Sequence, residues 1–137
     1  MLNYDDCIVY LLAKAYQKAH ANLKKRLQAV GLTPVQALVL AAVAQEEGSA
    51  TGDIGKKLTL DNATLSGVLD RLAEGGWVLK EKDQEDKRFV RIYLSEKTRR
   101  MAPVLVQERE KANEEILGRL SVEEKILLRR LLKDVQG

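Results

Sequence analysis

Residues 58–95 decide the fold, and they read LTLDNATLSGVLDRLAEGGWVLKEKDQEDKRFVRIYLS. The pattern predicts a helix over about 62–74, a stop at Gly75-Gly76, and two strands, Trp77–Lys82 and Arg88–Leu94, joined by a charged loop. A helix followed by a two-stranded hairpin is the plan of a winged helix, which places the helix in the major groove of DNA and the hairpin beside it. The stretch therefore predicts a DNA-binding protein.

The helix expected over 62–74 has one apolar side and one side of small polar residues. Its leucines recur at helical spacing and should face the core: Leu65, Leu69 and Leu72. Short polar residues on the other side allow the helix to approach phosphates and bases, and Asn62 suits bidentate pairing with adenine. The predicted DNA-contacting residues of this region are Thr51, Asn62, Ala63, Thr64, Ser66, Gly67 and Arg71. For Arg71 a surface ion pair with Asp70 or Glu74, or a contact with the wing, is an alternative.

The loop between the two strands, DQEDKR at 83–88, carries the predicted wing contacts. A winged hairpin can insert an arginine into the narrow minor groove, where the negative potential is strongest. Arg88 is at the position to do this, with Lys87 as a phosphate contact, and Asp86 is expected to orient the Arg88 guanidinium. The alternative is a solvated charged turn, as most charge runs are.

Composition limits the class of protein. The chain has 137 residues, 45% hydrophobic and 31% charged, as expected for one soluble domain. Its longest apolar run, near 37–44, is about eight residues, whereas a membrane span needs roughly 20. Asp5 and Asp6 stand where a signal peptide would carry positive charge. We therefore expect a cytoplasmic protein without a membrane partner.

Charge gives only weak support for DNA binding. The net charge is +3 and the pI is about 9.0, a mild indication of polyanion binding. Residues 53–94, however, hold eight Lys or Arg and eight Asp or Glu, so the predicted DNA-binding segment is neutral. The prediction therefore depends on the placement of individual residues.

No motif indicates an enzyme. One cysteine and one histidine exclude an internal disulfide, a multi-cysteine metal site and a His-rich site. No Gly-rich phosphate loop and no nucleophile elbow occurs. We expect no catalytic residue, no metal and no cofactor.

Five further helices are predicted, and the one over 34–46 is apolar nearly all round, so it should lie in the core. The expected helices cover about 4–30, 34–46, 51–58, 96–118 and 122–135, with Thr33, Thr51, Ser95 and Ser121 as N-caps. A first helix of about 27 residues is long for a compact domain, which favours contact with a partner chain. The expected fold class is mainly α with a small β-hairpin wing: a single domain over 1–137 with a winged-helix lobe at about 33–95.

The chain resembles the MarR family of dimeric winged-helix regulators over nearly all of its length. The resemblance rests on VGLTPVQALVL at 30–40, on DNATLSGVLDRLAEGGWV at 61–78 and on the wing, DKRFVRIYLS at 86–95. The wing matches the family's Asp-x-Arg, followed by alternating apolar residues and then Leu-Thr or Leu-Ser. Each piece is weak alone, but their order and spacing together are specific.

The resemblance implies a homodimer formed by residues 1–32 and 96–137, with two recognition helices in successive major grooves of a pseudo-palindromic operator. It also implies that Arg88 is the minor-groove arginine with Asp86 as its partner. Members are often repressors that release DNA when a small aromatic or phenolic molecule binds. Two departures stand out. Thr98 replaces a usual glycine, so the entry into the last long helix is expected to differ, and Gly55 replaces a usual alanine, which should loosen its helix by up to about 1 kcal/mol.

The first helix carries two further sets of candidates. Cys7, with Tyr4 and Tyr10 three residues away on either side, resembles the cysteine of hydroperoxide-sensing members, although its spacing to Gly31 is about two residues longer. A packing role is the alternative for Cys7, because reactivity needs a lowered thiol pKa. The predicted effector-binding residues are Tyr10, Lys14, Gln17 and His20, where Lys14 or His20 can pair with a carboxylate; solvated or interface positions are the alternative.

Three functions remain to be separated. The leading prediction is a ligand-responsive, DNA-binding transcriptional repressor. A thiol-based redox regulator acting through Cys7 is one alternative, and a winged-helix module that binds protein without DNA is another. The neutral charge of residues 53–94 favours the last, whereas Arg88 and the small polar surface at 62–67 argue against it.

Overall fold

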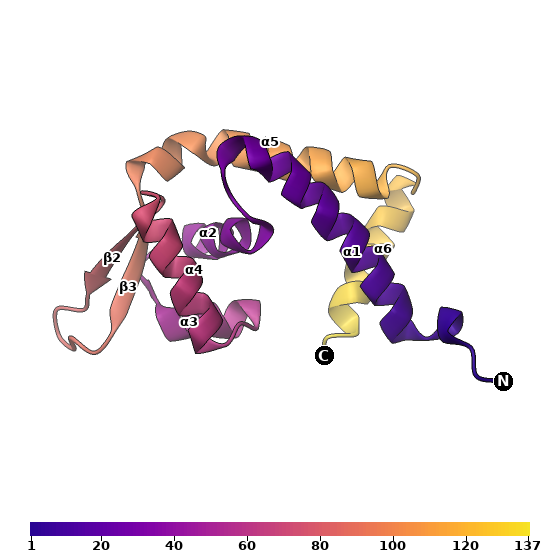
Figure 1. The fold of residues 1–137 in the computed structure, drawn as a ribbon, viewed down its shortest axis with the longest axis horizontal. Helices are drawn as coiled ribbons and strands as arrows, with labels where there is room; N and C mark the ends of the chain where they lie inside the picture. The colour runs from indigo at the N-terminus through magenta and orange to yellow at the C-terminus, as the bar shows by residue number, and fades with distance from the viewer. The chain divides into compact units, whose positions relative to one another are not determined.

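A computed structural model describes residues 1–137 as a mainly helical chain with a small antiparallel sheet (Figure 1). This confirms the predicted fold class. The chain forms two compact units, one made of residues 1–26 with 107–137 and the other of residues 27–106.

The unit of residues 27–106 is the winged helix. Its elements are η2 (Gln28–Val30), α2 (Pro34–Gln45), β1 (Ser49–Ala50), α3 (Thr51–Leu58), α4 (Asn62–Glu74), β2 (Val78–Lys82), β3 (Val90–Leu94) and the first half of α5 (Glu96–Leu117). The strand order is β1-β3-β2, all antiparallel, with Val78 paired to Leu94 and Lys82 to Val90. β1 was not predicted from the sequence, because a two-residue strand shows no alternation.

α2 lies at the centre of this unit. Thr33 caps it with a complete capping box, in which Thr33 Oγ1 accepts from the Gln36 N–H at 3.2 Å and Gln36 Oε1 accepts from the Thr33 N–H at 2.9 Å. α2 contributes Val39, Leu40, Ala42 and Val43 to the core as predicted, but it is not buried all round, since Leu38 is 54% exposed. The buried core comprises Val39, Leu40 and Val43 of α2 with Ile54, Leu65, Leu69, Leu72, Trp77, Val78 and Ile92 from its neighbours.

α3 differs from the sequence-based expectation in two ways. Thr51 is the first helical residue and not the N-cap; Ala50 holds the cap position and makes no side-chain hydrogen bond, because the chain enters α3 directly from β1. Gly55 is buried, and a Cβ there would lie 3.1 Å from the Leu60 carbonyl oxygen. The expectation that Gly55 only loosens α3 was therefore incomplete, since an alanine would crowd the turn into α4.

The entry into α5 is held by two hydroxyl groups. Ser95 caps the helix, because its Oγ accepts from the Thr98 N–H at 3.2 Å, and the same hydroxyl donates to the Gly76 carbonyl at 2.6 Å. Thr98 is buried, and its hydroxyl donates to the Trp77 carbonyl at 2.6 Å. As predicted, the entry into α5 differs from one with glycine at position 98, because the Thr98 hydroxyl makes a hydrogen bond that glycine cannot make.

The unit of residues 1–26 and 107–137 contains η1 (Tyr4–Asp6), nearly all of α1 (Ile8–Leu27), the second half of α5 and α6 (Val122–Asp134). The single helix expected over 4–30 is wrong at both ends. Cys7 is extended between η1 and α1, and Gln28–Val30 forms a separate 3₁₀ turn. Ser121 caps α6 with the predicted capping box.

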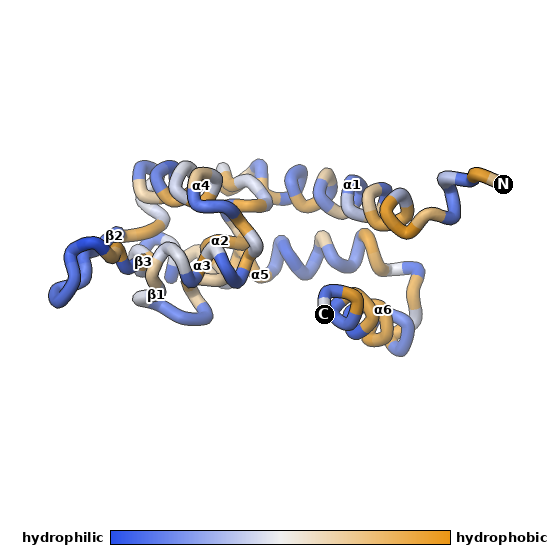
Figure 2. Tube along the Cα trace, turned by 90° about the horizontal axis from the view of Figure 1, so that it is seen from below, coloured by the Kyte–Doolittle hydropathy of each residue, from blue (hydrophilic) through white to orange (hydrophobic).

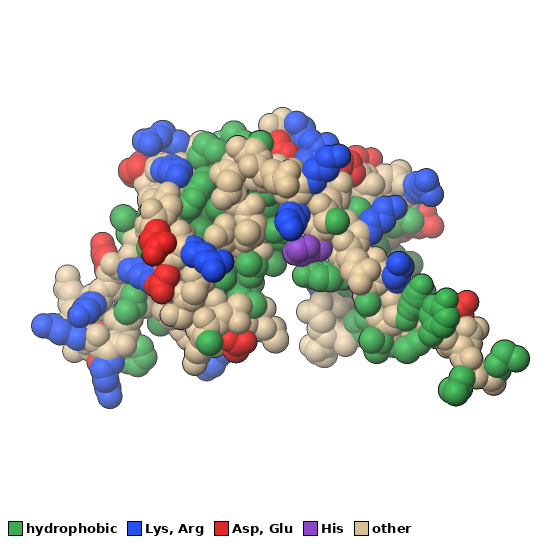
Figure 3. All heavy atoms as spheres, viewed as in Figure 1, with side chains coloured by type: hydrophobic (Ala, Val, Ile, Leu, Met, Phe, Trp, Pro, Cys, Tyr) green, Lys and Arg blue, Asp and Glu red, His purple; other side chains and the backbone are tan.

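Polar contacts join α1 to the second half of α5. Arg26 forms ion pairs with Glu115 and, at 3.7 Å, with Glu108, while the Asn22 side chain donates to the Ala112 carbonyl at 3.2 Å. Of the hydrophobic residues in this unit only Ala112 is buried. Hydrophobic side chains instead gather on its surface (Figure 3).

No single helix is long and apolar enough to span a membrane. The segments Ile8–Val30 and Pro34–Gln45, taken together across their break, pass the test of length and composition as a bent pair.

Candidate nucleic-acid interface

The start of α4 is fixed by its cap. Asp61 Oδ1 accepts from the Thr64 N–H at 2.7 Å, and the Thr64 hydroxyl donates to Asp61 Oδ2 at 3.1 Å. These hydrogen bonds to Thr64 hold the pKa of Asp61 below its ordinary value. Because the Thr64 hydroxyl donates its proton to Asp61, it cannot also donate to a phosphate. In this conformation Thr64 can contact DNA only as a hydrogen-bond acceptor.

The predicted DNA-contacting residues of α4 occupy different sides of its exposed surface. Asn62, Ala63, Thr64, Ser66, Gly67 and Arg71 are all exposed. Asn62 and Ser66, four residues apart, line a groove shared with α3 and the wing. Ala63 and Gly67 lie further round the helix, outside this groove.

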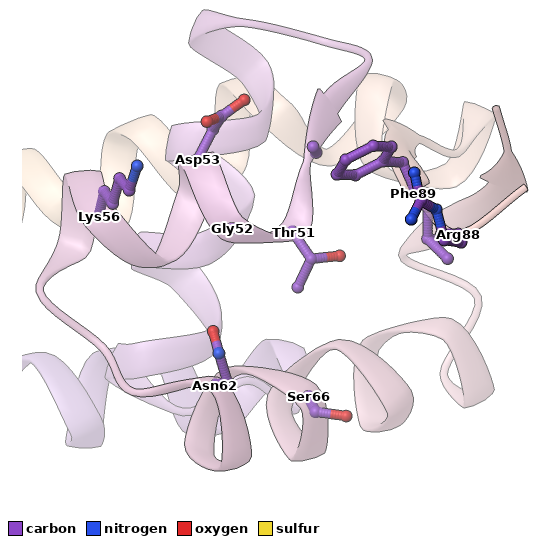
Figure 4. A pocket seen from close by; sticks show the side chains of 10 residues that line it. Thr51, Gly52, Asp53, Lys56, Asn62, Ser66, Arg88 and Phe89 are labelled. Carbon is purple, nitrogen blue, oxygen red and sulfur yellow. The ribbon is translucent and has the colours of Figure 1, made fainter. Parts of the chain in front are cut away.

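The groove has a volume of about 550 Å³ and lies within the unit of residues 27–106. We call it the α3–α4–wing groove. Figure 4 shows Asn62 pointing from α4 toward α3, with Lys56 and Arg88 at opposite sides of the view. Its lining residues are Ala50, Thr51, Gly52, Asp53, Lys56, Asn62, Ser66, Arg88, Phe89 and Val90.

The wing orients its arginine through a neighbouring carboxylate. Arg88 Nε donates to Asp86 Oδ1 at 3.0 Å and its terminal nitrogen to Oδ2 at 2.8 Å, a bidentate pair. The Arg88 backbone N–H also donates to Asp86 Oδ1 at 3.1 Å. These contacts lower the pKa of Asp86 and raise the pKa of Arg88. The Arg88 side chain remains 86% exposed, so the guanidinium is oriented and still accessible.

The rest of the hairpin loop is short and polar. It is hydrophilic throughout (Figure 2), and Lys and Arg side chains crowd its tip (Figure 3). The Asp83 N–H donates to the Phe89 carbonyl at 2.9 Å, and the Phe89 N–H donates to the Asp86 carbonyl at 3.1 Å. Lys87 is exposed and forms no ion pair.

Arg71 forms neither of the ion pairs considered for it, with Asp70 or with Glu74. Asp70 forms an ion pair with Lys80 of β2, and Arg71 has no carboxylate within ion-pairing distance. The alternative of an ion pair with Asp70 or Glu74 is therefore wrong. Its contact with DNA stays a prediction.

Six lining residues were not predicted from the sequence, and three of them carry a charge or an aromatic ring: Asp53, Lys56 and Phe89. The two in α3 were overlooked because the predicted surface was limited to the start of α4 and the wing. Phe89 carried a usable signal. It is the only phenylalanine of the chain, and it sits on the outward side of the strand pattern beside Arg88.

The residues predicted to bind an effector lie along α1 in the other unit. Tyr10 and His20 are half-buried, whereas Lys14 and Gln17 are exposed. The Tyr10 ring stacks on Tyr4 with centroids 4.9 Å apart, and His20 lies 5.4 Å from the Tyr16 ring.

Cys7 is exposed, and no hydrogen bond joins its thiol to Tyr4 or Tyr10. The two tyrosine rings stack on one another instead. The packing role considered for Cys7 is not seen within a single chain, and nothing in its contacts indicates a redox role.

A helical core with α4 exposed beside a two-stranded wing defines a winged-helix DNA-binding protein of the transcription-regulator class. The model of the MarR family matches residues 32–90, from just before α2 to the first residue of β3. The chain belongs to the MarR family, as the resemblance predicted.

Relatives support this assignment. The HTH-type transcriptional regulator TtmR of Methylorubrum extorquens is 38% identical over 91 residues, 66% of this chain and 45% of TtmR. The match thus spans about half of that relative's length. The HTH-type transcriptional repressor NicR of Pseudomonas putida is 27% identical over 124 residues, 90% of this chain and 78% of NicR.

Solved structures agree over the full chain. Bordetella bronchiseptica BpsR, studied for the regulation of its DNA binding by 6-hydroxynicotinic acid, has a TM-score of 0.93 at 25% identity, covering 100% of this chain and 98% of BpsR. A mutant MarR from Escherichia coli complexed with operator DNA has a TM-score of 0.90 at 25% identity, covering 100% of each chain.

Proposed function

We propose that this regulator is a homodimeric repressor that binds a pseudo-palindromic operator and releases it when a small aromatic or phenolic effector binds. The observation that carries operator binding is the oriented, exposed Arg88 beside the polar α3–α4–wing groove. A guanidinium held by Asp86 loses little further freedom when it enters a minor groove, where the negative potential attracts it. The operator complex of the related MarR supports this use of the fold.

Homodimer formation is supported by the unit of residues 1–26 and 107–137. Its exposed apolar side chains are Leu2, Tyr4, Ile8, Val9, Leu11, Leu12, Tyr16, Val122, Ile126, Leu127, Leu131, Leu132 and Val135. Monomeric soluble proteins rarely expose so many large apolar residues on so few elements. A second copy of the same unit is the partner that a pseudo-palindromic operator requires, because the symmetry of the dimer matches that of the DNA.

The effector proposal rests on Tyr10, Lys14, Gln17 and His20. An aromatic ring, a cation and polar groups at steps of three or four residues along α1 suit a small aromatic acid. BpsR, whose DNA binding is regulated by 6-hydroxynicotinic acid, supports a ligand of this kind. The repressor role is supported by NicR, and the relatives, as transcriptional regulators, support the absence of catalysis.

The test of operator binding is fluorescence anisotropy on DNA from upstream of the protein's own gene, titrated across salt. We expect tight binding that weakens steeply with salt and exceeds binding to a scrambled duplex, because released counterions drive association with phosphates. Binding to neither duplex, nor to any sequence selected from random DNA, would instead favour a winged-helix module that binds protein.

The test of the wing is Arg88→Ala. We expect operator affinity to fall about tenfold or more, without a change in thermal unfolding, since Arg88 is exposed and its only partner is Asp86. Arg109→Ala removes an exposed arginine from α5 and serves as the matched control. Equal affinity of Arg88→Ala and the wild type would remove the wing from the mechanism.

A further inference from the structure

The lining of the α3–α4–wing groove combines two kinds of surface. Thr51, Asn62 and Ser66 offer hydroxyl and amide groups, and Lys56 adds an ammonium group. Apolar carbon is supplied by Ala50, Phe89 and Val90. A base edge in the major groove presents hydrogen-bonding groups in one plane, whereas a DNA strand alternates charged phosphates with apolar deoxyribose rings. The lining of the groove, with polar and charged groups beside apolar carbon, matches the alternating phosphates and deoxyribose rings of a DNA strand.

The Phe89 ring forms one wall of the groove. Hydrogen bonds of its N–H and its carbonyl fix the backbone at this residue, while 51% of Phe89 stays exposed. In Figure 4 the ring lies on the wing side of the groove, near Thr51. A half-exposed aromatic ring is suited to contact with the apolar face of a sugar.

The adjacent lysines of α3 differ in their partners. Lys57 forms an ion pair with Glu46 and lies outside the groove. Lys56 lines the groove and has no carboxylate within ion-pairing distance. Arg88, the other lining cation, is already bound by Asp86. Lys56 is therefore the only positively charged side chain of the lining that has no carboxylate partner.

We propose that this groove seats the sugar–phosphate backbone of one DNA strand, with Lys56 as a phosphate-binding residue. Asn62 and Ser66 then hold the backbone instead of reading bases, in contrast to the adenine pairing expected for Asn62. Base reading falls to the side of α4 that carries Ala63, Gly67 and Arg71. The inference rests on the proposed operator binding and assigns the positioning contacts within it.

The carboxylate of Asp53, which also lines the groove, leads to a second expected effect on DNA binding. Asp53 lies in the first turn of α3, three residues before Lys56, and forms no ion pair. A carboxylate in a groove that holds phosphates repels them, so its removal strengthens binding to every DNA sequence. A groove that held base edges would show a smaller gain, because the carboxylate would then lie further from the phosphates.

The main experiment compares Lys56→Ala with Lys57→Ala by anisotropy, on the operator and on a scrambled duplex, from about 50 to 200 mM salt. We expect Lys56→Ala to weaken binding to both duplexes by about tenfold, with the ratio between them unchanged and the salt slope smaller by about 0.9 for each bound subunit. Lys57→Ala should stay within about twofold of the wild type. Thermal unfolding checks that both variants fold, and Lys56→Gln repeats the test with a longer side chain.

Two further variants separate backbone contact from base reading. Asn62→Ala, tested on operators with single base-pair changes, should lose affinity equally for all of them, and Asp53→Asn should gain affinity for all. A loss confined to one base pair would show Asn62 to be a base reader and overturn the proposal. If Lys56→Ala bound DNA with the same affinity and the same salt slope as the wild type, the proposal would also be overturned, although operator binding itself would stand. Failure of the wild type to bind any DNA would overturn operator binding and this inference together.

Discussion

The two units of this chain bury their apolar residues to very different extents. The winged-helix unit of residues 27–106 contains every buried hydrophobic residue except Ala112. The unit of residues 1–26 and 107–137 leaves most of its large apolar residues exposed, and α6 buries none of its residues.

This difference shows which part of the chain is complete by itself. A core that is closed within one chain gains its stability from burial that is independent of protein concentration. An apolar surface that is covered only by a second chain adds stability only when that chain binds. The two units should therefore respond differently to substitution.

The largest expected effect is from Leu131→Asp in α6. Leu131 is 45% exposed in the single chain, and a charge at this position would be buried in the proposed dimer interface. We expect the dimer dissociation constant to rise at least about a hundredfold, or ~3 kcal/mol, measured by sedimentation equilibrium. Leu79→Asp in β2, where the leucine is similarly exposed, should leave the dimer intact. A dimer dissociation constant that Leu131→Asp leaves unchanged would contradict a dimer interface that covers α6.

The next effect is from Leu65→Ala in α4. Leu65 is fully buried, so truncation should cost about 2–5 kcal/mol of unfolding free energy through lost burial and a cavity. Urea unfolding at several protein concentrations checks it. We expect the loss to be the same at every concentration, whereas the loss in Leu131→Ala should grow with concentration. A concentration-dependent loss in Leu65→Ala would contradict a core closed within one chain.

A smaller effect is expected from Thr98→Val at the entry into α5. The Thr98 hydroxyl donates to the Trp77 carbonyl, which also accepts from the Ser95 N–H at 3.1 Å, so this oxygen keeps one partner after the change. We expect a loss of about 1 kcal/mol in unfolding free energy. Thr98→Ser retains the hydroxyl and should lose less than Thr98→Val. The reverse order would show that the methyl group, and not the hydrogen bond, matters.

The smallest effect concerns pH and Glu47. Its carboxylate accepts from the Leu94 N–H at 2.9 Å and from Arg99 at 2.6 Å, and these contacts lower the pKa of Glu47 below 4.5. A carboxylate with a lowered pKa stabilises the folded state above its ordinary pKa, and this stabilisation is lost as pH falls through the folded value. The wild type should thus exceed Glu47→Gln in unfolding free energy at pH 7, by less than about 1 kcal/mol, and the difference should shrink as pH falls below the ordinary pKa of a glutamate. A difference that does not shrink as the carboxylate is protonated would contradict the assigned cause.

The elements with strong end signals were predictable from the sequence. Thr33 with Gln36 and Ser121 with Glu124 cap helices as expected, because side-chain caps act between residues three apart and need no tertiary context. Thr51 failed as a cap because pairing between β1 and β3 brings the chain into α3 from a strand. That pairing joins residues more than forty positions apart.

Within the candidate site, the Asp86–Arg88 pair was predictable because the two residues are neighbours in a short loop. The grouping of Lys56 and Asp53 with Asn62 and Phe89 was not, because these residues come from three elements that only the packed core brings together.

Short-range spacing along the chain was enough to predict the family, the winged-helix order of elements and the partnership of Asp86 with Arg88. Contacts between distant segments were needed to show that Lys56 lines a groove while Lys57 forms an ion pair, that a Cβ at Gly55 would crowd the Leu60 carbonyl, and that the apolar side chains of α6 stay uncovered. Burial, close approach and charge pairing depend on which distant segments meet, and folding fixes these meetings through packing across the whole core.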